Sequence, residues 1–186
     1  VTIPEGFNAV QIADAFASKL VNFNKSKFLI QTKRLEGSLF PDTYFIPVTA
    51  TASSTIKLLH DNFTRQVLQI LPQVESSGKT LAEIITIASL LEAEVISKED
   101  REIVSDILWK RLSIGMPLQV DSELGTYEFV GLPDKPINNP GLVSIEAALH
   151  PRSTPYWYFL TDKDGNAHYA KIFDEHKINK AKYLSP

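Results

Sequence analysis

Apolar residues recur at three- and four-residue intervals along most of this chain of 186 residues. That spacing is typical of amphipathic helices. It predicts long helices over residues 9–20, 54–71, 81–95 and 97–115, and shorter ones over 25–30, 145–149 and 175–184. Runs rich in β-branched and aromatic residues predict strands over residues 1–3, 43–46, 156–161 and 168–172. Because helices dominate and strands are few, we expect an α+β fold.

The order of elements predicts a division near residue 47. If residues 43–46 pair with residues 1–3, the segment 1–47 forms a small βααβ module. A sheet of two strands is only marginally stable by itself, so we expect this module to pack against the neighbouring domain. A polar linker follows, and residues 48–186 then form a mainly helical domain with a small β-sheet. Pro72 is expected to end the helix over 54–71.

The helix over 81–95 carries a glutamate among its apolar residues. Thr80 and Glu83 form a capping box that fixes the start of this helix. On a wheel of about 100° per residue, Glu92 lies about 40° from Ala88, inside the apolar arc. Glu94 lies about 120° away and is expected to be a solvated surface charge.

A carboxylate on an apolar face allows two interpretations. Desolvation raises the pKa of a carboxyl group, and one that stays protonated near neutral pH can act as a general acid. The alternative is a structural ion pair, with Arg101 or Arg111 as the partner of Glu92. The helix pattern by itself favours the ion pair.

Two polar loops add candidate binding surfaces. In the stretch 116–122, Gln119 and Asp121 alternate with Leu118 and Val120, which puts the two polar side chains on one face of an extended segment. They could bind sugar hydroxyls or face water. The proline- and asparagine-rich loop over 131–141 could be a rigid binding wall or a plain connector.

Composition narrows the function classes. The net charge is −3 and the basic residues are scattered, so the sequence shows no cluster of positive charge of the kind that binds nucleic acid. The chain has no cysteine, and its histidines lack metal-ligand spacing, so we expect no metal site. No apolar run reaches the roughly 18–20 residues that span a bilayer.

Several motifs occur in an order that identifies a family. They are Ile3-PEG, Leu35-EGSLFPDTY, Ala88-SLLEAE, Arg111-LSIGMPLQVDS, Gly131-LPDKPINNPG and the closing Tyr158-FL with HYAKIFDEH. Together they resemble the YceG-like family of endolytic murein transglycosylases, over nearly the whole chain.

The resemblance implies a bacterial cell-wall enzyme without cofactor, held in the cytoplasmic membrane by one N-terminal helix, with this part facing the wall. Such enzymes cut glycan strands between N-acetylmuramic acid and N-acetylglucosamine and leave 1,6-anhydro ends. Their partners are glycan strands and wall-synthesis proteins. The resemblance makes the segment 1–47 a LysM-like module and maps the catalytic glutamate to Glu92. The candidates for holding the sugars are Gln119, Asp121, Asn139, Tyr127 and Glu36, of which Glu36 could equally support the fold.

The chain departs from the family pattern near the presumed site. Ala93 stands where lysine is common, Glu123 stands where threonine is usual, and the segment 122–127 is short. Two alternatives therefore stay open. One is a lysozyme-like muramidase with Asp121 or Glu123 as second carboxylate. The other is a wall-binding scaffold without catalytic activity.

Overall fold

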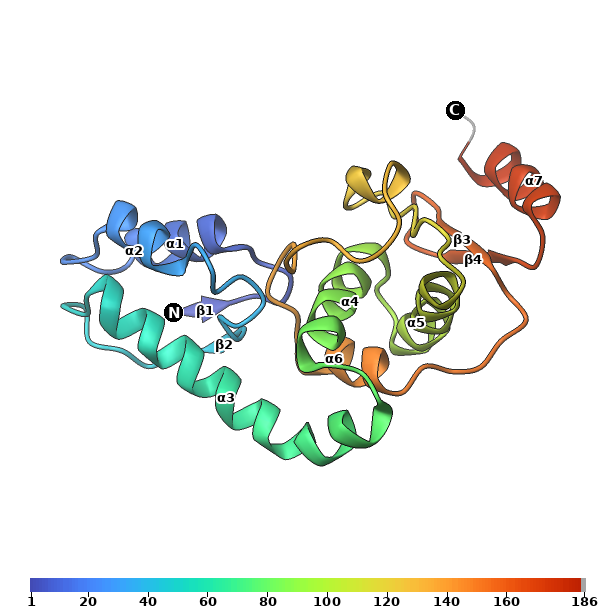
Figure 1. Ribbon diagram of the computed structural model, residues 1–186. Helices are drawn as coiled ribbons and strands as arrows, with labels where there is room; N and C mark the ends of the chain where they lie inside the picture. Colours follow the sequence, from blue (N-terminus) through green and yellow to red (C-terminus); the bar gives the residue numbers. More distant parts are fainter. Residues whose placement is uncertain (185–186) are drawn as a thin grey trace.

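A computed structural model describes residues 1–184. Within these residues, seven α-helices, a short 3-10 helix and two small antiparallel sheets form a mixed α+β arrangement, as the sequence predicts. Figure 1 shows an N-terminal lobe on one side, a helical lobe on the other and one long helix running beneath both. Within the described residues, no helix is both long and apolar enough to cross a membrane.

The N-terminal lobe has the predicted order of strand, two helices and strand. Its elements are β1 (Thr2–Ile3), α1 (Ala9–Ala17), α2 (Lys25–Thr32) and β2 (Asp42–Thr43). β1 pairs antiparallel with β2, with Thr2 opposite Thr43, so the predicted pairing is confirmed although the second strand is shorter than expected. Asn8 caps α1 through a capping box, which explains why this helix begins where it does.

The core of this lobe continues into the next helix. Ile12, Phe16, Phe28 and Leu39 are fully buried, and they pack with Leu59 of α3 (Ala52–Ser77). A sheet of only two strands thus gains its support from a helix beyond residue 47. The domain division at residue 47 and its LysM-like character stay predictions.

The prediction that Pro72 ends the third helix is wrong. α3 runs through Pro72 to Ser77 and ends at Gly78, which takes a left-handed conformation with φ of +70°. A proline removes one hydrogen bond from a helix interior, but a helix that packs along two cores can continue past it. Ile70 and Val74 on either side of Pro72 are buried.

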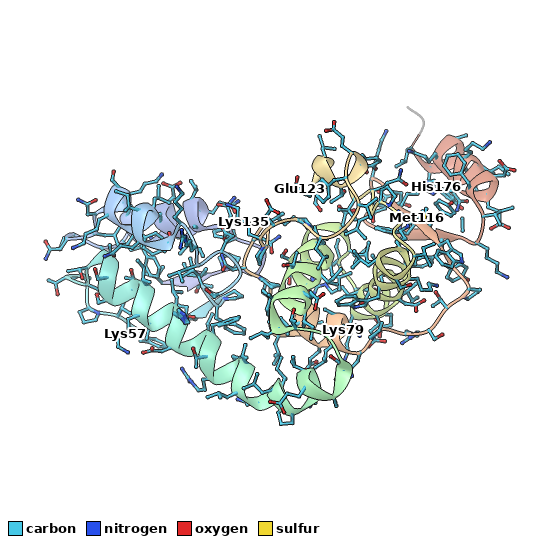
Figure 2. All side chains as sticks on the ribbon, in the orientation of Figure 1. Lys57, Lys79, Met116, Glu123, Lys135 and His176 are labelled. Carbon is cyan, nitrogen blue, oxygen red and sulfur yellow. The ribbon has the colours of Figure 1, made fainter. Side chains whose placement is uncertain are left out.

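The helical lobe surrounds α4 (Leu81–Glu94), where every residue from Ile84 to Leu91 is buried. α5 (Lys98–Ser113) and α6 (Leu142–Leu149) pack against α4 and against each other. The hairpin β3 (Tyr158–Thr161) and β4 (Ala167–Ala170) follows, and α7 (Phe173–Tyr183) covers it. In Figure 2, Lys135 lies where the two lobes meet, whereas His176 projects from α7 at the far end of the molecule.

Candidate active site

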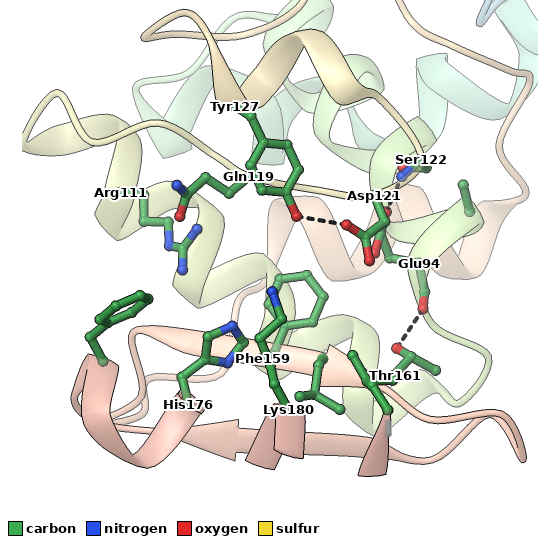
Figure 3. Close-up of a pocket in the computed structure, with 14 residues that line it drawn as sticks. Glu94, Arg111, Gln119, Asp121, Ser122, Tyr127, Phe159, Thr161, His176 and Lys180 are labelled. Carbon is green, nitrogen blue, oxygen red and sulfur yellow. Dashed lines mark hydrogen bonds between the residues drawn. The ribbon is translucent and has the colours of Figure 1, made fainter. Parts of the chain in front are cut away.

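A cleft of about 450 Å³ opens where the C-terminal end of α4 meets the loop after α5 and the β3–α7 region. We call it the α4 cleft. Its polar lining includes two carboxylates, an amide, a phenol, an imidazole and two cations (Figure 3). These residues are Glu94, Asp121, Gln119, Tyr127, His176, Arg111 and Lys180.

Glu94 is the last residue of α4, and its carboxyl group points into the cleft (Figure 3). The backbone N–H of Ser122 donates to its Oε1 at 2.7 Å, and the Thr161 hydroxyl donates to its backbone carbonyl at 2.9 Å. Burial raises the pKa of Glu94, and the negative charge of Asp121 adds to that rise, while the bonds from Ser122 oppose it. The negative pole at the end of a helix also disfavours a carboxylate there. Glu94 therefore keeps its proton to a higher pH than an exposed carboxyl does.

Asp121 and Tyr127 form the second polar pair of the cleft. The Tyr127 hydroxyl donates to Asp121 Oδ1 at 2.6 Å. Burial and this bond raise the pKa of the phenol, so Tyr127 is a hydrogen-bond donor at any physiological pH. Tyr127 comes from a 3-10 helix (Leu124–Tyr127) that lies within the short segment noted in the sequence.

The loop that presents Gln119 and Asp121 is held by its apolar neighbours. Leu118 and Val120 are fully buried, and both polar side chains line the cleft, which confirms the predicted alternation. The backbone of Gln119 has φ of +53°, a rare conformation for a residue other than glycine. Backbone strain of this kind gathers at functional sites when the surroundings enforce it. Here the buried Thr126 does so, since it bonds to the backbone of Gln119 and Val120.

Glu92 lies outside the α4 cleft. Its carboxylate pairs with Arg101 at 2.7 Å and accepts the Gly141 N–H at 3.0 Å, with 6% of its side chain exposed. The Glu5 carboxyl packs so tightly on Gly141 that a Cβ there would lie 1.8 Å from it. Burial and the nearby Glu92 charge raise the pKa of Glu5. The geometry therefore favours the ion-pair alternative that the sequence left open for Glu92.

The helical wheel predicts the burial of Glu92 correctly but misplaces Glu94, for a physical reason. A wheel assumes that the side opposite the apolar arc faces water. α4 is buried from Ile84 to Leu91, and the polar side of its C-terminal end lines a cleft instead of facing open water. The expectation that Glu94 is a simple surface charge is wrong, because its side chain is partly buried beside Asp121 and Ser122.

Asn139 and Glu36 connect the two lobes instead of lining the cleft. The Asn139 side chain donates to the Phe7 carbonyl at 3.0 Å and to Glu36 at 2.7 Å, and accepts the Leu39 N–H at 2.8 Å. Glu36 also accepts the Ala9 N–H at the start of α1. With 1% of Asn139 exposed, its amide has no group left for a sugar. Burial raises the pKa of Glu36. We call this network, together with Glu92 and Arg101, the lobe junction.

The structure thus separates the five candidates for sugar binding. Gln119, Asp121 and Tyr127 lie together in the α4 cleft, whereas Asn139 and Glu36 lie at the lobe junction. Glu123 bonds to its own loop at the Gly125 N–H and does not line the cleft.

Sequence reasoning missed Glu94, Arg111, His176 and Lys180 as cleft residues. The second glutamate of the Glu92-Ala-Glu94 pair was the one available signal. Within residues 1–184, no group of three or more histidine, aspartate or glutamate side chains is placed to hold a metal ion.

Comparisons with known proteins agree on one family. A sequence model of the YceG-like family matches residues 1–125 and 120–182. An endolytic murein transglycosylase of Bacillus subtilis is 29% identical over the whole of this chain, which covers 65% of that protein. One of Streptococcus pneumoniae is 29% identical over 82% of this chain, which covers 33% of that protein. The chain therefore spans less than two thirds of these relatives.

The fold also matches that of a solved structure from the same family. The crystal structure of a YceG-like protein from Listeria monocytogenes superposes with a TM-score of 0.87 and 25% sequence identity. The match covers 95% of this chain and 74% of that chain.

Proposed function

Because the chain belongs to the YceG-like family, we propose that it is an endolytic murein transglycosylase. It cuts peptidoglycan glycan strands between N-acetylmuramic acid and N-acetylglucosamine and leaves 1,6-anhydro-muramic ends. The Bacillus and Streptococcus relatives are endolytic murein transglycosylases, which supports this proposal. The substrate lies outside the cytoplasmic membrane, so the domain acts there. Attachment through an N-terminal membrane helix and contact with wall-synthesis proteins stay predictions.

The observation that carries the proposal is a partly buried carboxyl with a raised pKa, aimed into a polar cleft. Glu94 meets these conditions, whereas Glu92 is engaged in its pair with Arg101. We therefore assign the catalytic role to Glu94 in place of Glu92. A carboxyl that is protonated near neutral pH is a general acid, as in other enzymes that cleave glycosidic bonds.

One carboxyl suffices for the whole reaction. Protonated Glu94 gives its proton to the glycosidic oxygen as the bond from C1 to that oxygen breaks. The resulting carboxylate takes the proton of the 6-hydroxyl while O6 bonds to C1. Glu94 is protonated again at the end, and no water is consumed. The Ser122 N–H on Oε1 stabilises the carboxylate that forms midway, and the proton resides on the other oxygen, Oε2.

The neighbouring polar groups hold the sugar. Tyr127 orients the Asp121 carboxylate through its 2.6 Å hydrogen bond, and the free oxygen of Asp121 can accept from a sugar hydroxyl. Gln119 offers an amide from the same wall. A charge at Asp121 also stabilises the positive charge that develops on the sugar ring in the transition state.

A muramidase is the second candidate, and Asp121 is the observation that favours it. A second carboxylate near the acid could activate water in place of the 6-hydroxyl. The two reactions differ in their products, because hydrolysis leaves reducing ends and transglycosylation leaves anhydro ends.

The test compares wild type, Glu94→Gln and Glu92→Gln on purified uncrosslinked glycan strands, with product ends identified by mass spectrometry. We expect wild type to give anhydro ends and Glu94→Gln to lose about 10³-fold in kcat/KM, since general acid catalysis contributes about 10²–10⁴-fold. Glu92→Gln should unfold at lower denaturant, because it weakens a buried ion pair, yet it should cleave at a nearly normal rate while folded.

Three results contradict parts of this proposal. Reducing ends would support the muramidase. Full activity in Glu94→Gln with loss in Glu92→Gln would return the catalytic role to Glu92. Absence of cleavage by wild type would support a binding scaffold.

A further inference from the structure

The α4 cleft has walls of opposite charge. Glu94 and Asp121 lie on the wall formed by α4 and the loop that follows α5, whereas His176 and Lys180 rise from α7 on the facing wall (Figure 3). Arg111 lines the cleft behind them. Nothing in the acid-base chemistry proposed for Glu94 requires these cations, so they need a separate explanation.

Arg111 is a buried cation that no carboxylate neutralises within residues 1–184. Its guanidinium donates to backbone carbonyls, to Trp157 at 2.9 and 2.7 Å and to Leu118 at 2.6 Å. It stacks on the Tyr158 ring at 5.1 Å. Carbonyl dipoles satisfy its hydrogen bonds but leave its full positive charge, and a partly desolvated charge acts strongly at short range. Arg111 therefore contributes positive charge to its side of the cleft.

Lys180 adds a second cation, and it forms no salt bridge with any carboxylate in the part of the chain that the structure describes. By contrast, Lys177 on the same helix pairs with Asp174 at 2.7 Å and lies outside the cleft lining. Figure 3 shows the Lys180 side chain extending from α7 toward the interior of the cleft.

His176 contributes a fixed donor. Its ring stacks on Tyr158, with centroids 5.4 Å apart, and its Nδ1 is buried without a hydrogen-bond partner among residues 1–184. An acceptor nitrogen tolerates such a position better than an N–H does, so the neutral ring carries its proton on Nε2. Burial, Lys180 and Arg111 all lower the pKa of His176, against a smaller opposing effect of Asp121. The imidazole is thus a neutral N–H donor beside two cations.

We propose that this α7 wall, formed by Lys180 and His176 together with Arg111, binds the free carboxylate on the C3 lactyl substituent of a muramic sugar that carries no peptide. The inference rests on the proposed function, since it names the group of the glycan that the facing wall recognises. The reacting sugar then spans the cleft, with its C1 at Glu94 and its carboxylate at α7. Lys180 and His176 are positioning residues that favour muramic sugars without a peptide, because a peptide converts the lactyl carboxylate into a neutral amide.

The experiment uses one pair of ligands that differ only in charge. Glycan oligosaccharides freed of their peptides carry lactyl carboxylates, and coupling these to methylamine gives neutral methylamides. Binding of both is measured by calorimetry to the full chain carrying Glu94→Gln, which keeps the oligosaccharides uncut. The same background carries Lys180→Met, His176→Phe, which keeps the ring stacking, or the matched control Lys177→Met.

We expect the carboxylate form to bind about tenfold more tightly than the methylamide, a preference that charge-assisted hydrogen bonds of this kind can supply. Lys180→Met should reduce this ratio to about twofold, His176→Phe should reduce it less, and Lys177→Met should leave it unchanged. Circular dichroism verifies that each variant is folded.

The inference would be overturned if the chain carrying Glu94→Gln bound the carboxylate and the methylamide with equal affinity. It would also be overturned if Lys180→Met left the tenfold preference for the carboxylate unchanged. Cleavage by the chain with Glu94 intact is assayed in parallel and tests the proposed function separately. If that chain cuts both ligands equally well and the binding ratio is one, the transglycosylase proposal stands and this inference fails. If it cuts neither while the binding ratio persists, the inference stands and the catalytic proposal fails.

Discussion

The lobe junction and the α4 cleft are both rich in polar side chains, but they differ in where the hydrogen bonds of those side chains go. At the junction, Asn139 and Glu36 bond to each other and to the backbone, and Glu92 pairs with Arg101. In the cleft, Glu94 accepts one backbone N–H, and Lys180 forms no salt bridge with a described carboxylate. Groups that are satisfied within the protein stabilise the fold, whereas groups with unused capacity can bind a ligand.

This comparison separates effects on stability from effects on activity. A substitution at the junction should change the free energy of unfolding and leave the chemistry of the folded protein alone. A substitution in the cleft should do the reverse. Residues of the same type elsewhere in the chain serve as matched controls.

Asn139→Ala is expected to have the larger effect on stability. It leaves the buried Leu39 N–H without an acceptor and removes a donor from Glu36, which should lower the free energy of unfolding by about 2–3 kcal/mol. Chemical denaturation measures this change. Asn179→Ala, which removes a single 3.2 Å bond to the Tyr169 carbonyl, should lower it by about 1 kcal/mol or less.

The folded Asn139→Ala protein should cleave glycan at close to the wild-type rate. A large loss of kcat/KM without loss of stability would instead return Asn139 to the substrate site and remove the distinction between the two regions.

Tyr127→Phe and Tyr44→Phe form a second matched pair. The Tyr127 hydroxyl reaches only Asp121 in the cleft, so its removal should lower kcat/KM by about tenfold, or about 1.4 kcal/mol, with unchanged stability. The buried Tyr44 hydroxyl donates to the Phe40 carbonyl at 2.6 Å and accepts from Asn62. Its removal should lower the free energy of unfolding by about 1 kcal/mol and leave kcat/KM unchanged.

Both measurements are needed on each tyrosine variant. If Tyr127→Phe were as active as wild type, Asp121 would not depend on this hydrogen bond for its position, and the role proposed for the pair would fail.

Local signals in the sequence predicted much of the fold. Asn8 and Thr80 start their helices through capping boxes, and both act within one turn of the chain. The alternation of Leu118 and Val120 with Gln119 and Asp121 likewise needs no distant contact. The prediction that Pro72 ends α3 is wrong because packing along the whole length of this helix outweighs the local tendency of proline to end a helix.

The candidate site was less predictable because it depends on what surrounds each element. Whether Glu92 or Glu94 faces a cleft is decided by Arg101 and Gly141 on one side and by Ser122 on the other. Asn139 lies in a motif that looks like a binding loop, yet its partners come from residues about a hundred positions earlier in the chain. His176 and Lys180 enter the cleft only because the β3–β4 hairpin carries α7 to it.

The central claim is that Glu94 retains its proton until a glycan strand arrives, and a pH titration tests it most directly. The carboxyl carbon of Glu94 can be followed by NMR in protein labelled with carbon-13, with Glu94→Gln used to assign its resonance. Only the protonated form donates, so kcat/KM should fall as pH rises through the pKa of Glu94. The account predicts a titration midpoint above the ordinary value of 4.5 and a fall in kcat/KM at the same pH. A midpoint at or below 4.5, or activity that is indifferent to it, would contradict the account.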